Sequence, residues 1–194
     1  MNTNEDIILK TLELGHEKGL ANVSILDIAT ATGLKKSSLY SHFKSKDDII
    51  QSMMDHCHDL LAEKAFVVDF KAKDAQSLLV SLIESFIETF AEPPLSHYYA
   101  VVQQQRLYHP SFSTIAHELE SMVTARVKVA LEYCVQRSWL NIPDTDAAGE
   151  LFSCAVQDCL AKLSATPEAA SSLECEDTDW ELNRLVDNLL MMFE

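Results

Sequence analysis

Apolar residues recur along the chain with the three- and four-residue spacing of amphipathic helices. In the first quarter this pattern predicts helices at about 4–18, 25–32 and 36–43, and a longer helix from Lys46 to about residue 67. Leu39 and Phe43, four positions apart, are expected to face the core from the third helix. Hydroxyl residues three positions before a carboxylate predict three N-caps: Thr3 with Asp6, Ser24 with Asp27, and Ser45 with Asp48.

The remaining sequence predicts five more helices, at about 74–91, 95–108, 113–138, 144–165 and 178–193. Proline residues lie between several of them, and Gly19 and Gly33 are expected to end the first two helices of the chain. The chain is therefore predicted to be all-α, with about nine helices. We expect a three-helix domain at residues 1–46 and one further helical domain at residues 47–194.

Charge is distributed unevenly between these two parts. The 194 residues include 15 Lys and Arg and 30 Asp and Glu, which gives a formal net charge of −15 at pH 7. Residues 1–46 hold six lysines against five acidic residues, a balance of +1, so residues 47–194 hold nine basic and 25 acidic residues, a balance of −16. We therefore expect a polyanionic partner to meet only the first part.

Composition argues against several classes of function. Only four glycines are present, three of them in the first 33 residues, and neither a P-loop nor a G-x-G-x-x-G motif occurs. The five cysteines are scattered and never spaced C-x-x-C, which disfavours a disulfide framework and a structural zinc site. No apolar run is long enough to cross a bilayer, and the first residues do not resemble a signal peptide, so we expect a cytoplasmic protein.

One basic stretch, GLKKSSLYSHFKSK at residues 33–46, carries four lysines. It contains the third predicted helix and the glycine turn before it. Two short helices joined by such a turn, after a supporting helix, form a helix-turn-helix, whose second helix enters the DNA major groove with its first residues foremost. Lysine and serine side chains suit contacts with bases and phosphates. The first turn of that helix holds the candidate contacts Lys35, Lys36, Ser37 and Ser38.

This stretch lies within a longer run, ILKTLELGHEKGLANVSILDIATATGLKKSSLYSHFKSKDDII at residues 8–50, that resembles the DNA-binding head of the TetR family of bacterial transcriptional repressors. The matching positions are Ile8, Glu17 to Gly19, Ser24, Asp27 to Ala29, Gly33, Lys36, Leu39, Tyr40, His42, Phe43, Ser45, Lys46 and Asp48. The resemblance covers about a quarter of the chain. It implies a dimeric repressor that binds a palindromic operator and is released by a small-molecule effector.

The resemblance also assigns contact roles to individual residues. Lys36, Ser37 and Ser38 would read bases; Tyr40, His42 and Lys46 would meet phosphate or flanking groups; Ser24 would dock the second helix on the DNA backbone; and Lys35 is a further candidate. The alternatives are packing for Tyr40 and plain solvent exposure for His42 and Lys35. One departure from the family concerns the core, because Gly15 stands where the family usually has a large aromatic residue. Leu20 is expected to fill that gap.

The last two predicted helices offer more apolar surface than the core of one chain would use. Paired across a two-fold axis, they would form a four-helix bundle and place two heads about 34 to 36 Å apart, as a palindrome requires. The alternative is that they pack only within their own chain. The candidate dimer residues are Leu151, Ala155, Cys159, Trp180, Leu182, Leu185, Val186, Leu189 and Phe193.

The effector that the resemblance implies would bind in the helical body, and the sequence does not identify it. The candidate pocket residues are Phe86, Phe90, Tyr99, Gln103, Arg106, Tyr108 and Trp139. Each is as easily an ordinary core position, although Gln103 and Arg106 are favoured because buried polar groups need partners. The alternative function is a helix-turn-helix architectural or interaction protein without an effector.

Enzymatic and metal chemistry are not expected. The histidines outside the head show no spacing typical of a nucleophile with its base. His56 and His58 are two positions apart and therefore point to different sides of a helix, which disfavours a metal site. We expect no cofactor and no metal. The expected partners are a double-stranded DNA operator, a second copy of the chain and a small-molecule effector, with no membrane.

Overall fold

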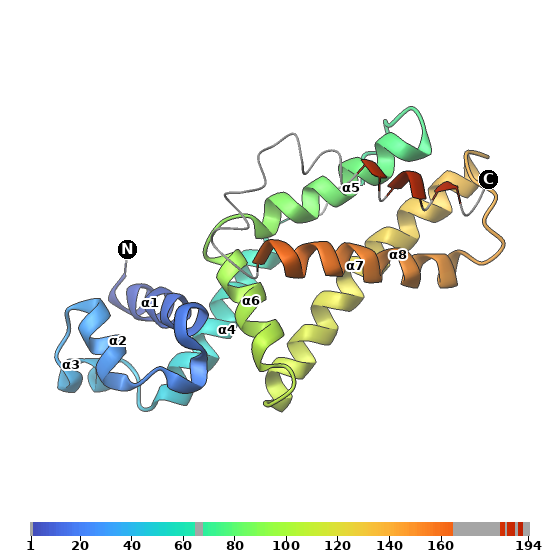
Figure 1. Cartoon of the computed structure of the whole chain (residues 1–194). Helices are drawn as coiled ribbons and strands as arrows, with labels where there is room; N and C mark the ends of the chain where they lie inside the picture. Colours follow the sequence, from blue (N-terminus) through green and yellow to red (C-terminus); the bar gives the residue numbers. More distant parts are fainter. Residues whose placement is uncertain (1, 65–67, 165–182, 185, 189, 192–194) are drawn as a thin grey trace. The chain divides into compact units, whose positions relative to one another are not determined.

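A computed structural model describes residues 2–64, 68–164, 183, 184, 186–188, 190 and 191 (Figure 1). These residues form eight α-helices and one short 3₁₀-helix, with no strand among them, so the all-α prediction is confirmed. The chain divides into two compact units, one of residues 1–64 and 92–113 and the other of residues 65–91 and 114–194. No helix in the described part is long and apolar enough to span a membrane.

The first unit contains the amino-terminal helices. They are α1 (Thr3–Lys18), the 3₁₀-helix η1 (Leu20–Asn22), α2 (Ile25–Thr32), α3 (Lys36–His42) and α4 (Lys46–Ala62). α6 (Leu95–Gln105) belongs to the same unit and packs against both α1 and α4 (Figure 1). The two compact units do not follow the predicted division at residue 46, because α4 and α6 belong to the first unit. The domain boundary at residue 46 therefore stays a sequence-based prediction.

Buried aliphatic side chains hold the first unit together. Each of α1 to α4 contributes at least one side chain that is at most 1% exposed, namely Ile7, Leu12, Ile28, Leu39 and Ile49. Burying one such side chain contributes about 1.5–3 kcal/mol. A Cβ atom added to Gly15 would lie only 3.0 Å from Cδ1 of Leu20. The prediction that Leu20 fills the space beside Gly15 is therefore confirmed.

The helix starts follow the capping pattern with one correction. The hydroxyls of Ser24 and Ser45 accept the N–H groups of Asp27 and Asp48, as predicted. α1 starts at Thr3, the predicted cap itself, and its N-cap is Asn2, one residue earlier: the side chain of Asn2 accepts the N–H of Asn4, and Glu5 accepts the N–H of Asn2. Thr3 as N-cap was therefore wrong; asparagine caps a helix at least as well as threonine, and Glu5 completes the box.

The second unit contains α5 (Ala75–Phe90), most of α7 (Pro110–Gln136) and α8 (Thr145–Ser164). Leu78, Leu82, Phe86 and Phe90 form a buried stripe along α5 and are at most 4% exposed. α7 begins at Pro110 rather than near residue 113, because proline suits the first position of a helix. Asp144 accepts the N–H of Ala147 and caps α8. Of the predicted last helix, residues 183, 184, 186–188, 190 and 191 are described, and all of these except residue 191, which lies in a turn, are helical.

Candidate nucleic-acid interface

α2 and α3 form the predicted helix-turn-helix. α2 ends at Gly33, which has a left-handed backbone with φ of 68° and donates its N–H to the last turn of the helix. α3 begins three residues later and buries Leu39 and Phe43, which are 0% and 6% exposed. The opposite side of α3 faces solvent, so the candidate contacts Lys35, Lys36, Ser37 and Tyr40 are exposed and Ser38 is half-buried.

Lys36 and Tyr40 lie one turn apart on the exposed side of α3. The ammonium nitrogen of Lys36 is 6.0 Å from the centroid of the Tyr40 ring. Tyr40 is 46% exposed, and its hydroxyl makes no hydrogen bond within the described part of the chain. The hydroxyl is therefore available to an external acceptor such as a phosphate oxygen.

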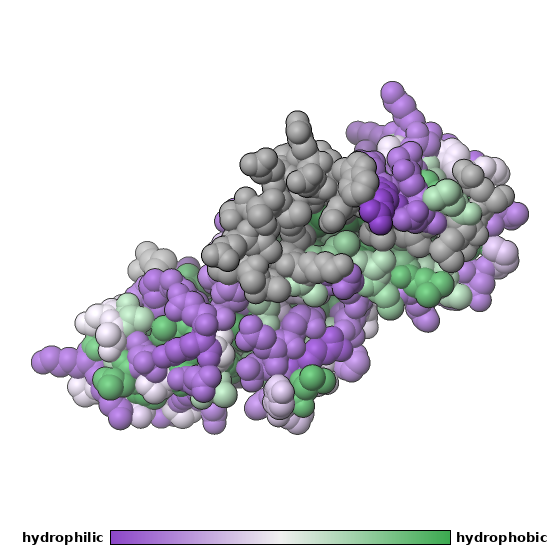
Figure 2. Space-filling view, viewed as in Figure 1, coloured by the Kyte–Doolittle hydropathy of each residue, from purple (hydrophilic) through white to green (hydrophobic). Residues whose placement is uncertain are grey.

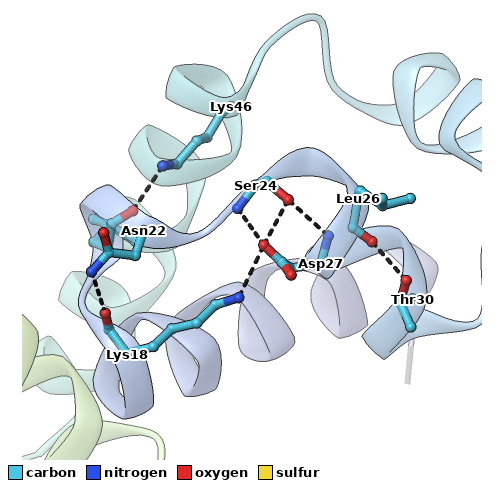
Figure 3. Close-up of polar contacts among 8 residues, drawn as sticks. Lys18, Asn22, Ser24, Leu26, Asp27, Thr30 and Lys46 are labelled. Carbon is cyan, nitrogen blue, oxygen red and sulfur yellow. Dashed lines mark hydrogen bonds and ion pairs between the residues drawn. The ribbon is translucent and has the colours of Figure 1, made fainter.

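Ser24 belongs to a polar cluster at the start of α2 (Figure 3). One carboxylate oxygen, Oδ2 of Asp27, accepts the backbone N–H of Ser24 at 2.7 Å and its hydroxyl at 2.6 Å. The ammonium of Lys18 lies 2.9 Å from the same oxygen. These contacts hold the pKa of Asp27 well below its usual range, and the hydrogen bonds from Ser24 contribute more to this than the contact with Lys18. Both hydrogen-bond donors of Ser24 are bonded to Asp27. A phosphate contact by the Ser24 hydroxyl therefore requires this hydroxyl to turn away from Asp27.

Lys46 stands at the first position of α4, and its ammonium donates to the backbone carbonyl of Leu20 at 2.7 Å (Figure 3). Burial is the main reason that the pKa of Lys46 is lowered. The contact connects η1, which precedes α2, with the first residue of α4, which follows α3. It therefore joins the two ends of the chain segment that carries α2 and α3. An ammonium has three N–H donors, so two remain for a phosphate.

His42, at the end of α3, contacts the start of α1. Its Nδ1 lies 2.7 Å from Oδ1 of Asn4. A side-chain carbonyl oxygen accepts, so Nδ1 carries the proton in this contact, and the neutral ring has no second N–H. His42 can therefore donate to a phosphate only as an imidazolium.

Sequence reasoning missed Lys18 and Asn4, because their partners lie on other helices and no local spacing indicates them. Leu26 is 65% exposed beside this cluster. On the face seen in Figure 2, the surface of the head is mostly hydrophilic with isolated apolar spots. A hydrophilic surface with a few exposed lysines suits contact with the DNA backbone.

The predicted effector-pocket residues are spread over both units. In the second unit Phe86 and Phe90 are buried and Trp139 is half-buried, with its ring 5.8 Å from that of Tyr133. In the first unit Tyr99 is buried, and Arg106 donates to the side-chain oxygen of Gln103 at 3.0 Å. Tyr108 is 82% exposed, which does not suit a pocket wall. The effector pocket stays a prediction.

The predicted dimer residues are described only in part. On α8, Leu151 is 58% exposed, whereas Ala155 and Cys159 are half-buried. Val186 is fully buried. Trp180, Leu182, Leu185, Leu189 and Phe193 lie outside the described residues. Within the described part, no group of three or more His, Cys, Asp or Glu residues is placed to hold a metal ion.

Residues 7–53 match the family model of the bacterial regulatory proteins of the TetR family. The amino-terminal head is thus a match to the TetR family. The matched range contains the whole of α2 and α3 and the start of α4. These are the elements that carry the exposed lysine and serine residues.

Two sequence relatives of the chain are transcriptional regulators. The HTH-type transcriptional repressor ComR of Escherichia coli is 23% identical over 170 residues, which cover 85% of this chain and 79% of the relative. IcaR of Staphylococcus aureus, a negative transcriptional regulator of the biofilm operon icaADBC, is 31% identical over 83 residues, which cover 43% of this chain and 45% of IcaR.

A solved structure extends the likeness to the rest of the fold. The TetR-family transcriptional regulator PfmR from Thermus thermophilus superposes with a TM-score of 0.66 at 20% identity, over 95% of this chain and 97% of PfmR. The family match and the helix-turn-helix together assign the chain to the DNA-binding transcriptional regulators.

Proposed function

We propose that the chain is a repressor that binds a palindromic operator as a dimer and leaves it when a small molecule binds the helical body. The observation that carries the proposal is the exposed lysine and serine edge at the start of α3. This edge lies in the part of the chain whose net charge is +1, whereas residues 47–194 carry −16. DNA is therefore attracted to the head and repelled by the rest of the chain.

In this proposal, the first turn of α3 enters the major groove. Lys36, Ser37 and Ser38 read base edges, because lysine donates to guanine acceptors and serine bonds to either bases or backbone. Tyr40 contacts a phosphate through its hydroxyl. Lys46 contacts a phosphate through the two ammonium N–H groups that do not bond to Leu20. Supporting phosphate contacts come from Lys35, from His42 as an imidazolium, and from Ser24 once its hydroxyl turns outward.

Dimerisation and effector release complete the proposal. Leu151 offers an exposed apolar side chain on α8, and a second head raises affinity without any new contact within each head. ComR and IcaR are named as a repressor and a negative regulator, which favours repression over activation. The effector is a small molecule of unidentified chemistry in the helical body.

Selection from a library of random-sequence DNA duplexes with the purified full-length chain tests the proposal. We expect recovery of one palindrome whose half-sites lie one helical turn, or a multiple of it, apart. Recovery of a single half-site would contradict the dimer. Recovery of no preferred sequence would contradict the repressor function altogether.

A further inference from the structure

We infer that the aromatic ring of Tyr40 positions the Lys36 ammonium for base reading and so sets the operator specificity of the head. The inference rests on the proposed function and deepens it. It gives Tyr40 two separable parts: a ring that acts on Lys36 and a hydroxyl that meets phosphate.

The contact between the two side chains is a cation–π pair. The ammonium of Lys36 lies 6.0 Å from the Tyr40 ring centroid, at the outer limit for such a pair. The two residues are four positions apart in α3, where side chains meet on one face of the helix. Both are exposed, so the pair lies on the surface that the proposed function turns toward DNA.

Other groups near Lys36 do not hold its ammonium. Lys36 is the first residue of α3, where the positive end of the helix dipole repels a cation. Its neighbour Lys35, at the N-cap position, adds another positive charge and makes no side-chain cap hydrogen bond. Within the described residues the Lys36 ammonium has no carboxylate partner. The ring is therefore the group that restricts where this flexible side chain carries its charge.

Restricting that position matters for specificity more than for affinity. A lysine ammonium is a compact charge on a four-carbon stem and can reach either a phosphate or the N7 and O6 atoms of a guanine. A lysine free to reach phosphates binds every sequence alike. Held above the Tyr40 ring, the ammonium is confined to a small region, which favours one base pair over its neighbours.

Two variants separate the ring from the hydroxyl. Tyr40→Phe and Tyr40→Leu both lose the hydroxyl, but only Tyr40→Leu loses the ring. Duplex selection is repeated with each variant, and affinities are measured for the selected duplex and for duplexes with single base-pair changes. Lys36→Met alone identifies the base pair that Lys36 reads, and it is also combined with each of the two Tyr40 variants.

We expect Tyr40→Phe to weaken binding to every duplex equally and to keep the selected sequence. Tyr40→Leu should weaken binding in the same way and should also reduce the preference for the correct base pair at the position read by Lys36 by a factor of about two to five. This factor corresponds to the free energy of an exposed cation–π pair. In the Lys36→Met background, Tyr40→Phe and Tyr40→Leu should discriminate equally.

A measurement without DNA tests the contact itself. The ring current of Tyr40 should shift the side-chain ε-proton resonances of Lys36 in NMR spectra, and the shift should persist in Tyr40→Phe and vanish in Tyr40→Leu. Unchanged thermal melting shows that both variants fold.

Equal discrimination by the two variants at every base pair, or no loss of discrimination in Lys36→Met, would overturn the inference while the wild-type palindrome still supported the proposed function. A wild-type chain that selects no sequence would overturn both.

Discussion

The ammonium of Lys18 lies 2.9 Å from Oδ2 of Asp27 and ties the end of α1 to the start of α2. The Asp27 carboxylate also accepts two hydrogen bonds from Ser24. These contacts lower the pKa of Asp27, with the Ser24 hydrogen bonds as the largest cause. A carboxyl group with a lowered pKa stabilises the folded state above its unfolded pKa of about 3.9, and this stabilisation is lost as the pH falls further.

Asp27→Asn is therefore expected to lower the melting temperature at pH 7. The difference from wild type should shrink as the pH is lowered from 5 to 2, because Asp27 of the unfolded wild-type chain then binds a proton, whereas the folded chain holds the carboxylate ionised. Lys10→Gln is the matched control, since it breaks the exposed pair of Lys10 with Glu13 on the same helix and should change the melting temperature little. A difference for Asp27→Asn that stays constant with pH would show that the charge of Asp27 contributes nothing.

Leu20 occupies the space that a larger residue at position 15 would need. Gly15→Phe is expected to destabilise the chain by about 1–3 kcal/mol through overpacking against Leu20. Leu20→Ala leaves a cavity and should cost about 2–5 kcal/mol. In the double variant, the phenylalanine ring at position 15 fills the cavity left by Leu20→Ala. The double variant should therefore be more stable than the sum of the two single changes predicts. Urea unfolding measures all three, and strict additivity would contradict the close contact between these positions.

His16 of α1 and His97 of α6 stack with their ring centroids 4.3 Å apart and their planes 13° from parallel. Burial lowers the pKa of His97, and the charge of His16 lowers it further, against the opposing effect of Glu13 and Glu17. The folded state therefore favours the neutral ring. A histidine with a lowered pKa stabilises the fold above its unfolded pKa of about 6.5 and loses this contribution as the pH falls below it.

His97→Asn should accordingly flatten the fall in melting temperature between pH 7.5 and pH 5. His117→Asn serves as the control, because the side chain of His117 is 70% exposed on α7. If the pH profiles of His97→Asn and wild type are parallel, the stacked pair does not govern this part of the stability curve.

The proposed dimer predicts that a charge at position 151 separates the subunits. Leu151 is 58% exposed on α8, and Leu151→Asp would bury a carboxylate in an apolar interface. Sedimentation should give about twice the 21.7 kDa chain mass for wild type and the single mass for the variant. Val129→Asp, on the 41% exposed Val129 of α7, should stay dimeric. A monomeric wild-type chain, or a dimeric Leu151→Asp, would place the interface elsewhere or remove it.

Local signals in the sequence predicted most of the helices. The span of α2 follows from Ser24, which accepts the first N–H groups, and from Gly33, which adopts the left-handed conformation that ends a helix. The same logic failed at Thr3, where Asn2 offered an equally good cap one residue earlier. Helix ends without a glycine, such as Ala62 of α4, were placed several residues too late.

Contacts between helices were beyond the reach of sequence patterns. Lys46 was expected to contact phosphate or flanking groups, but its ammonium also donates to the Leu20 carbonyl, 26 residues away, which no local pattern indicates. The pairing of Lys18 with Asp27 likewise depends on how α1 and α2 pack. The exposed edge of α3 was predictable, because the burial of Leu39 and Phe43 fixes which side faces solvent.

The central claim is that the head binds DNA through the start of α3 and the start of α4. Titration of the selected duplex over a range of salt concentrations, with wild type, Lys36→Ala and Lys46→Ala, tests it most directly. We predict that Lys46→Ala weakens binding to all duplexes and lowers the slope of log K against log salt by about 0.9, one phosphate contact. Lys36→Ala should in addition change which duplex is preferred. Wild-type affinity, slope and preference in both variants would contradict the claim.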